Sequence, residues 1–183
     1  MDKRRRRPGR LARSGAVATV LLLLGTGSAC SDPEASQYVR VETGKIVVDR
    51  PTAWAAEMPV TAPWTQGFRL APDSVEQIQI SGDFGEFVTA SQAMGSLIGQ
   101  AQVSLAGFTV VQTRDIEVKG ASTAQVVQYT ITDNKDSQVS GEWIVAARWP
   151  YPQSVAVSIL SPQPNPDLER RVLESLELRP VLK

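Results

Sequence analysis

The first thirty residues constrain this chain most, because they determine which residues remain to fold as a domain. Seven cations between Lys3 and Arg13 precede an apolar run of about nine residues, Ala16 to Leu24. A basic segment followed by a short apolar run is typical of a secretory signal, whereas a membrane-spanning helix needs about twenty apolar residues. We therefore predict that residues 1–29 are a signal peptide and that the domain lies beyond them.

The only cysteine of the chain, Cys30, follows this run directly after Ser28 and Ala29. These residues resemble the lipobox of bacterial lipoproteins, in which the cysteine becomes the mature N-terminus and carries fatty acids such as palmitate. The resemblance implies lipidation of Cys30 and attachment to the outer face of the cytoplasmic membrane. Two or three acyl chains would hold a protein there stably, while one chain holds it only marginally. The alternatives are a plain secretory signal that leaves a free thiol, and a buried structural cysteine.

The composition beyond the leader excludes several classes of function. Seven of the 19 Lys and Arg and one of the 19 Asp and Glu precede Cys30, so the rest of the chain has 12 cations, 18 acids and a net charge of −6. This balance disfavours binding to nucleic acid or to an anionic membrane surface. The chain has no histidine, which removes the commonest general base and the commonest metal ligand.

The remaining residues are enough for one hydrophobic core and too few for two ordinary domains. Residues 30–44 are polar and lack a sustained period, so we predict a lipidated N-terminus followed by a flexible spacer. Residues 45–183 are predicted to form a single α+β domain. One cysteine allows no disulfide within the chain, so packing alone must stabilise this domain.

Two segments have the pattern of amphipathic helices. In Thr89–Leu105 apolar residues recur every three or four positions, Thr89 can cap the start, and Gly107 suits the end. Gly95 and Gly99 interrupt this segment, and we expect them to permit close packing against a sheet. The second helix is predicted after Pro166, with Asn165 as its N-terminal cap.

Most other segments alternate apolar and polar residues, as half-buried strands do. We predict strands at 45–48, 68–70, 75–81, 108–118, 123–132, 142–148 and from 155 onward, mostly joined by tight turns. The fold class is therefore α+β, a mostly antiparallel sheet of about six strands covered by helices.

This order of elements resembles the Mog1/PsbP-like fold, an α/β/α sandwich. The residues that contribute to the resemblance are Trp54, Gly107, Phe108, Tyr129 and the segment 176–178. The lipoprotein branch of this fold in actinobacteria includes the LpqN type, whose members are implicated in assembly of the cell envelope. The resemblance implies that the partners are envelope proteins or glycolipids.

Catalytic motifs are missing from the sequence. It contains no nucleophile elbow, no phosphate-binding loop and no Cys/His cluster, so we predict no catalytic residues, no metal and no cofactor. The acidic turn from Asp133 to Asp136 is better explained as a solvated hairpin turn than as a calcium loop. Glu86, Glu117 and Glu142 could act as an acid–base pair only if folding brings two of them together.

The candidate ligand-binding residues are aromatic side chains in proline-containing connections, namely Trp54, Trp64, Trp149 and Tyr151. Such rings could form a groove for a lipid, a glycan or a protein partner. The alternative is that they close the core over the ends of the sheet.

Three functions remain open. The first is a membrane-anchored envelope lipoprotein that acts as a non-catalytic accessory or binding protein. The second is an envelope hydrolase or transferase that uses carboxylates alone, which would require two carboxyl groups about 5 to 9.5 Å apart in a cleft. The third is a purely structural surface domain.

Overall fold

The computed structural model describes residues 37–133, 135–150 and 152–180, and these form two antiparallel sheets and two helices. The strands of the larger sheet are ordered β3-β4-β5-β9-β8-β7-β6. Their bounds are Ala56–Glu57 (β3), Gln66–Arg69 (β4), Gln77–Gly85 (β5), Thr109–Ile116 (β6), Thr123–Thr132 (β7), Gln138–Arg148 (β8) and Gln153–Ser161 (β9). The predicted α+β class with a mostly antiparallel sheet is confirmed.

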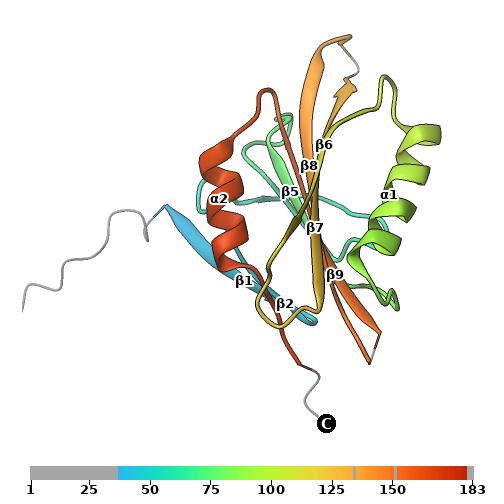
Figure 1. Ribbon diagram of the computed structural model, residues 1–183. Helices are drawn as coiled ribbons and strands as arrows, with labels where there is room; N and C mark the ends of the chain where they lie inside the picture. Colours follow the sequence, from blue (N-terminus) through green and yellow to red (C-terminus); the bar gives the residue numbers. More distant parts are fainter. Residues whose placement is uncertain (1–36, 134, 151, 181–183) are drawn as a thin grey trace, which may run out of the picture. The chain divides into compact units, whose positions relative to one another are not determined.

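The central strands of this sheet are buried on both faces. Along β8, Trp143 and Val145 pack into one hydrophobic cluster, while Ile144 and Ala146 pack into another. Because successive side chains of a strand point to opposite faces, the sheet must be covered on both sides. Helices α1 and α2 provide part of this cover, and Figure 1 shows them on opposite sides of the sheet.

Helix α1 (Ala90–Ser104) covers one face and begins and ends where the sequence indicates. The side chain of Thr89 accepts a hydrogen bond from the backbone N–H of Gln92, and Gly107 has a φ of 63° shortly after the helix ends. The apolar stripe of α1, which includes Met94 and Leu97, packs against Trp143 and Val145 in one cluster. The predicted helix and its N-terminal cap are therefore confirmed. The helix ends at Leu105 in extended backbone, so Gly107 lies in the turn that follows and does not cap the helix directly.

Helix α2 (Pro166–Ser175) lies on the other face with a second, smaller sheet. Asn165 caps the helix by accepting a hydrogen bond from the backbone N–H of Leu168, as predicted. The smaller sheet has the strand order β1-β2-β10, with β1 at Tyr38–Thr43, β2 at Ile46–Pro51 and β10 at Glu177–Leu178. Its residues Ile46 and Val48 share a hydrophobic cluster with Val172 of α2.

Strand β1 corrects the predicted spacer. Residues 30–44 were expected to be flexible, yet Tyr38–Thr43 pairs along its whole length with β2. Residues 39–42 alternate apolar and polar side chains, but the run is short and follows a mostly polar segment. Val41 is the only buried residue of this strand, and the backbone pairing with β2 defines the strand. The remainder of the predicted spacer that lies before residue 37 is outside the described residues.

Glycine allows the two sheets to approach each other. A Cβ atom placed on Gly82 of β5 would lie 2.0 Å from the backbone oxygen of Thr43, which is closer than such atoms approach. At the same place the backbone N–H of Lys45 donates to the oxygen of Gly82 over 2.9 Å. The β1–β2 hairpin is therefore bonded directly to the backbone of β5.

Gly95 and Gly99 do not have the role predicted for them. Both are exposed on α1, and a Cβ atom at either position would meet nothing within 4 Å. The expected close packing against the sheet is therefore wrong, because the two glycines lie on the solvent side of the helix. Among the described residues, no helix is long and apolar enough to cross a membrane.

Replacing either glycine with alanine should stabilise the domain. Alanine is favoured over glycine in a helix by about 0.5–1 kcal/mol, and neither site offers a clash. We expect Gly95→Ala and Gly99→Ala each to raise the free energy of unfolding by about that amount in urea denaturation. Gly141→Ala is the contrasting control, because its Cβ atom would lie 2.2 Å from the ring of Tyr129. A loss of stability in Gly95→Ala would contradict the exposed position.

Candidate functional site

The candidate site is built on a pair of polar residues that face each other across two central strands. Gln128 of β7 is the direct neighbour of Glu142 of β8 in the antiparallel register. Residues opposite each other in such a ladder project to the same face. The amide nitrogen Nε2 of Gln128 donates a hydrogen bond to Oε2 of Glu142 over 3.3 Å.

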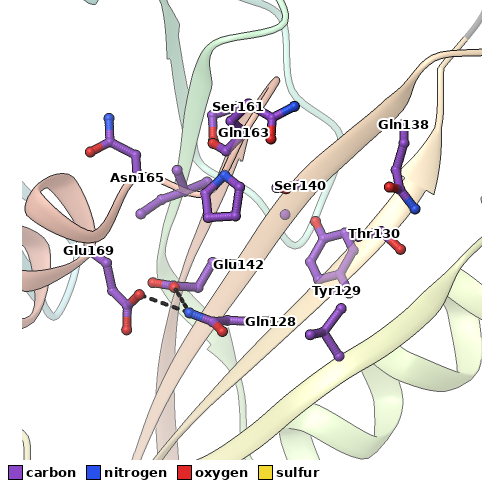
Figure 2. Close-up of a pocket in the computed structure, with 14 residues that line it drawn as sticks. Gln128, Tyr129, Thr130, Gln138, Ser140, Glu142, Ser161, Gln163, Asn165 and Glu169 are labelled. Carbon is purple, nitrogen blue, oxygen red and sulfur yellow. Dashed lines mark hydrogen bonds between the residues drawn. The ribbon is translucent and has the colours of Figure 1, made fainter.

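Helix α2 adds a second carboxyl group to this pair. Glu169 lies in the first turn of α2, where acidic side chains are favoured by the helix dipole. The same Nε2 atom of Gln128 donates to Oε2 of Glu169 over 2.9 Å, and Figure 2 shows the two carboxyl groups converging on this amide. Arg114 of β6 pairs with the other oxygen of Glu169. The two carboxyl groups are therefore bridged by one nitrogen atom.

A cavity of about 290 Å³ opens beside this cluster. Its size is near the lower end of the range for small-molecule sites. Hydroxyl and amide side chains contribute to the wall (Figure 2). Val111, Ile159 and Pro164 add apolar surface. The full lining consists of Val111, Gln128, Tyr129, Thr130, Gln138, Ser140, Gly141, Glu142, Ile159, Ser161, Gln163, Pro164, Asn165 and Glu169. The only residues among these that carry a formal charge are Glu142 and Glu169.

Glu142 is the unusual group of the cavity. Its side chain belongs to a residue only 8% exposed, and its Oε1 atom is buried without a hydrogen-bond partner among the described residues. Burial raises the pKa of Glu142 to about 7, although the hydrogen bond from Gln128 and the charge of Arg114 lower it. A buried acceptor without a partner costs free energy in the folded state, so a hydrogen-bond donor that a ligand brought to this oxygen would recover part of that cost.

The sequence identified only one half of this acidic pair. Of the three acids considered there, Glu86 and Glu117 are exposed and only Glu142 is buried. Its partner, Glu169, was not considered because it lies on a helix and meets β7 only through the tertiary fold. The signal that could have been used is local: Glu142 directly precedes the five apolar residues 143–147 of the same strand.

Two of the aromatic candidates, Trp54 and Trp64, lie on opposite faces of the large sheet. Trp54 is buried in the cluster that contains α2, and a cavity of about 450 Å³ adjoins it. Trp64 is half-buried against the other cluster, on the α1 side. Trp149 is 60% exposed at the end of β8, and Tyr151 and Cys30 lie outside the described residues. The common groove expected for these rings is therefore not formed by Trp54 and Trp64, because they pack on opposite faces of the large sheet.

A separate cavity of about 310 Å³ lies between α1 and the sheet. Trp64, Tyr129 and Trp143 contribute to its wall, and the ring centroids of Tyr129 and Trp143 are 4.1 Å apart. Burial raises the pKa of Tyr129 above its usual range, which keeps this hydroxyl neutral. Among the residues that the structure describes, none with a formal charge lines this cavity, so it differs in chemistry from the one at Glu142.

The acidic turn after β7 is a hairpin turn. The Oδ1 atom of Asp133 accepts hydrogen bonds from the backbone N–H groups of Lys135 and Ser137, each over 2.8 Å. This local bonding occupies the carboxylate in the way that Asx turns do. In the part of the chain that the structure describes, no group of three or more His, Cys, Asp or Glu side chains is placed to hold a metal ion.

Comparison with known proteins defines the class of fold. The domain has the PsbP-type α+β fold, as the order of its elements predicted. The solution structure of cyanobacterial PsbP (CyanoP) from Synechocystis sp. PCC 6803 matches with a TM-score of 0.56 and 11% sequence identity, covering 85% of this chain and 98% of CyanoP. No family model and no curated protein matches the sequence.

A second solved structure is similar to this chain. It is that of LpqN from Mycobacterium tuberculosis, described as involved in cell envelope biogenesis. The TM-score is 0.49 and the sequence identity 13%, and the match covers 79% of this chain and 91% of LpqN.

The raised pKa of Glu142 predicts a pH dependence of stability. A carboxyl group whose pKa is higher in the folded state than in the unfolded state destabilises the fold as it ionises, so the free energy of unfolding should fall between about pH 4.5 and about pH 7. Glu142→Gln removes this ionisation. We expect the variant to gain stability relative to the wild type over that interval, by about 1.4 kcal/mol for each unit of pKa shift.

Urea denaturation at pH 5 and pH 8 measures this difference. Glu86→Gln makes the same chemical change at an exposed position and should keep a constant difference from the wild type. An equal difference for Glu142→Gln at both pH values would contradict the raised pKa.

Proposed function

We propose that this protein is a membrane-anchored lipoprotein of the cell envelope and that its domain is a non-catalytic binding protein. The observation that carries the binding role is the cavity beside Glu142, where a buried carboxyl oxygen has no partner among the described residues. The leader, the lone cysteine and the polar residues after it support the anchoring. Envelope proteins and glycolipids are the partners that we propose for the anchored domain.

Anchoring is tested at the cysteine. We expect Cys30→Ala to move the protein from the detergent-rich phase to the aqueous phase in a phase-partition experiment, because the acyl chains supply the attachment. The intact mass of the membrane-extracted wild type should exceed that of the polypeptide from Cys30 onward by the mass of two or three acyl chains. Cys30→Ser separates loss of the sulfur from loss of a polar side chain. Retention of Cys30→Ala in the membrane would contradict the proposal.

Binding is tested by native mass spectrometry of protein produced in an actinobacterial host with its leader. We expect a small molecule to copurify with the wild type and to be lost from Ser140→Leu, whose larger side chain fills the cavity at its wall. Ser91→Leu makes the same change at an exposed position of α1 and should keep the ligand. If neither the wild type nor Ser140→Leu carried any mass beyond that of its own polypeptide and acyl chains, the result would count against a binding role for this cavity.

A carboxylate-dependent hydrolase is the second candidate, because two carboxyl groups contact one amide nitrogen. The Oε2 atoms of Glu142 and Glu169 lie 3.3 Å and 2.9 Å from the same nitrogen atom, which sets an upper limit on their separation. This limit includes the spacing of about 5–5.5 Å between the two carboxyl groups of retaining glycosidases. However, both oxygens of Glu169 are already bonded, to Gln128 and Arg114. A nucleophile or base must be free to face the substrate, so this occupancy favours binding over hydrolysis.

The two candidates differ in the effect of Glu142→Gln on turnover. A hydrolase that uses Glu142 as its general acid would lose about 10²- to 10⁴-fold in rate on nitrophenyl glycosides. A binding protein would give no turnover above buffer in either the wild type or the variant. Wild-type turnover that Glu142→Gln abolishes would replace the binding role with the catalytic one.

A further inference from the structure

We propose that the cavity beside Glu142 selects a hydroxyl-bearing primary amine, such as an amino sugar or amino alcohol, and that Oε1 of Glu142 binds its ammonium group. This inference rests on the proposed binding function and names the class of ligand. Its starting point is that a nine-tenths buried carboxyl group lines the cavity with one oxygen unbonded among the described residues.

The first step concerns the hydrogen bonds that are already made. The Nε2 atom of Gln128 donates hydrogen bonds to Oε2 of Glu142 and to Oε2 of Glu169. Arg114 donates to Oε1 of Glu169. The remaining oxygen, Oε1 of Glu142, is an acceptor when the carboxyl group is ionised. A ligand that satisfies it must therefore bring a hydrogen-bond donor.

The second step concerns charge. The formal charges in the lining belong to Glu142 and Glu169, and both are negative. Arg114 pairs with Glu169 and is absent from the lining, so it balances one of the two. An anionic ligand would be repelled, while a cation would compensate the charge of Glu142, whose desolvation is unfavourable. Hydrogen bonds between charged groups are also stronger than neutral ones.

The third step distinguishes an ammonium group from a metal ion and indicates the rest of the ligand. Only one carboxyl oxygen is free, whereas Ca²⁺ takes six to eight oxygen ligands. An ammonium group needs about three acceptors, and Glu142 can share this task with nearby hydroxyl and amide oxygens. The other lining residues, which include Thr130, Ser140 and Gln138, suit the hydroxyl groups of a ligand, while Val111 and Ile159 suit its carbon skeleton.

The charged groups around Glu142 also predict how binding responds to pH. Arg114 approaches from β6 and Glu169 from α2, while the neighbour on β9 is the uncharged Ile159. Because burial raises the pKa of Glu142 to about 7, the ionised form that binds an ammonium group is favoured above this pH. Affinity for the amine should therefore increase from pH 6 to pH 8.

The test compares glucamine with sorbitol, which differ by an ammonium group in place of one hydroxyl group. In calorimetric titrations of the membrane-extracted protein at pH 8, we expect glucamine to bind about 10- to 100-fold more tightly than sorbitol. Glu142→Gln should abolish this preference while Glu117→Gln, the same change on an exposed position, retains it. Thermal unfolding of each variant confirms that it is folded, and Ser140→Leu provides a second variant that blocks the cavity without changing Glu142.

Equal affinities for glucamine and sorbitol would overturn the selection of an amine while leaving the binding function intact. A preference that survives in Glu142→Gln would overturn the role of this residue. Failure of glucamine to bind at all would also overturn the inference. The proposed binding function is then judged separately, by whether the copurified ligand is lost from Ser140→Leu.

Discussion

The structure depends on a central strand that is buried on both faces. Residues of β8 alternate between two hydrophobic clusters, with Trp143 and Val145 toward α1 and Ile144 and Ala146 toward the smaller sheet and α2. Neither face can be exposed without losing the burial that stabilises the domain. Both helices and the β1–β2 hairpin are therefore required, and every polar side chain on β8 that lies beneath this cover loses contact with water.

Glu142 is the main consequence of this burial. Its position in the middle of β8 places a carboxyl group beside Glu169 of the first turn of α2, where Gln128 and Arg114 compensate only part of the lost hydration. The result is a group that burial keeps largely neutral below its pKa of about 7 and whose Oε1 atom has no partner within the described part of the chain. Such groups concentrate at functional sites, because the free energy that they cost in folding is available for binding.

Several elements could be predicted because their signals are local. The cap at Thr89, the cap at Asn165 and the full extent of β7 are as expected, since each depends on residues within a few positions. The spacer and the helix glycines were misjudged for the same reason. The segment Tyr38–Thr43 becomes a strand only because β2 pairs with it, and the exposure of Gly95 depends on which face of α1 meets the sheet.

The sequence by itself determined the basic and apolar segments of the first thirty residues, the position of Cys30, the lack of histidine and the alternation of strands and helices, because composition and periodicity are properties of neighbouring residues. The tertiary structure alone decided the site. Gln128 and Glu169 are 41 positions apart in the sequence, and Arg114 and Glu169 are 55 positions apart. No local sequence pattern could therefore predict these contacts. Their meeting follows from the order of strands in the sheet and from the face that α2 covers, which are set by burial of the whole core.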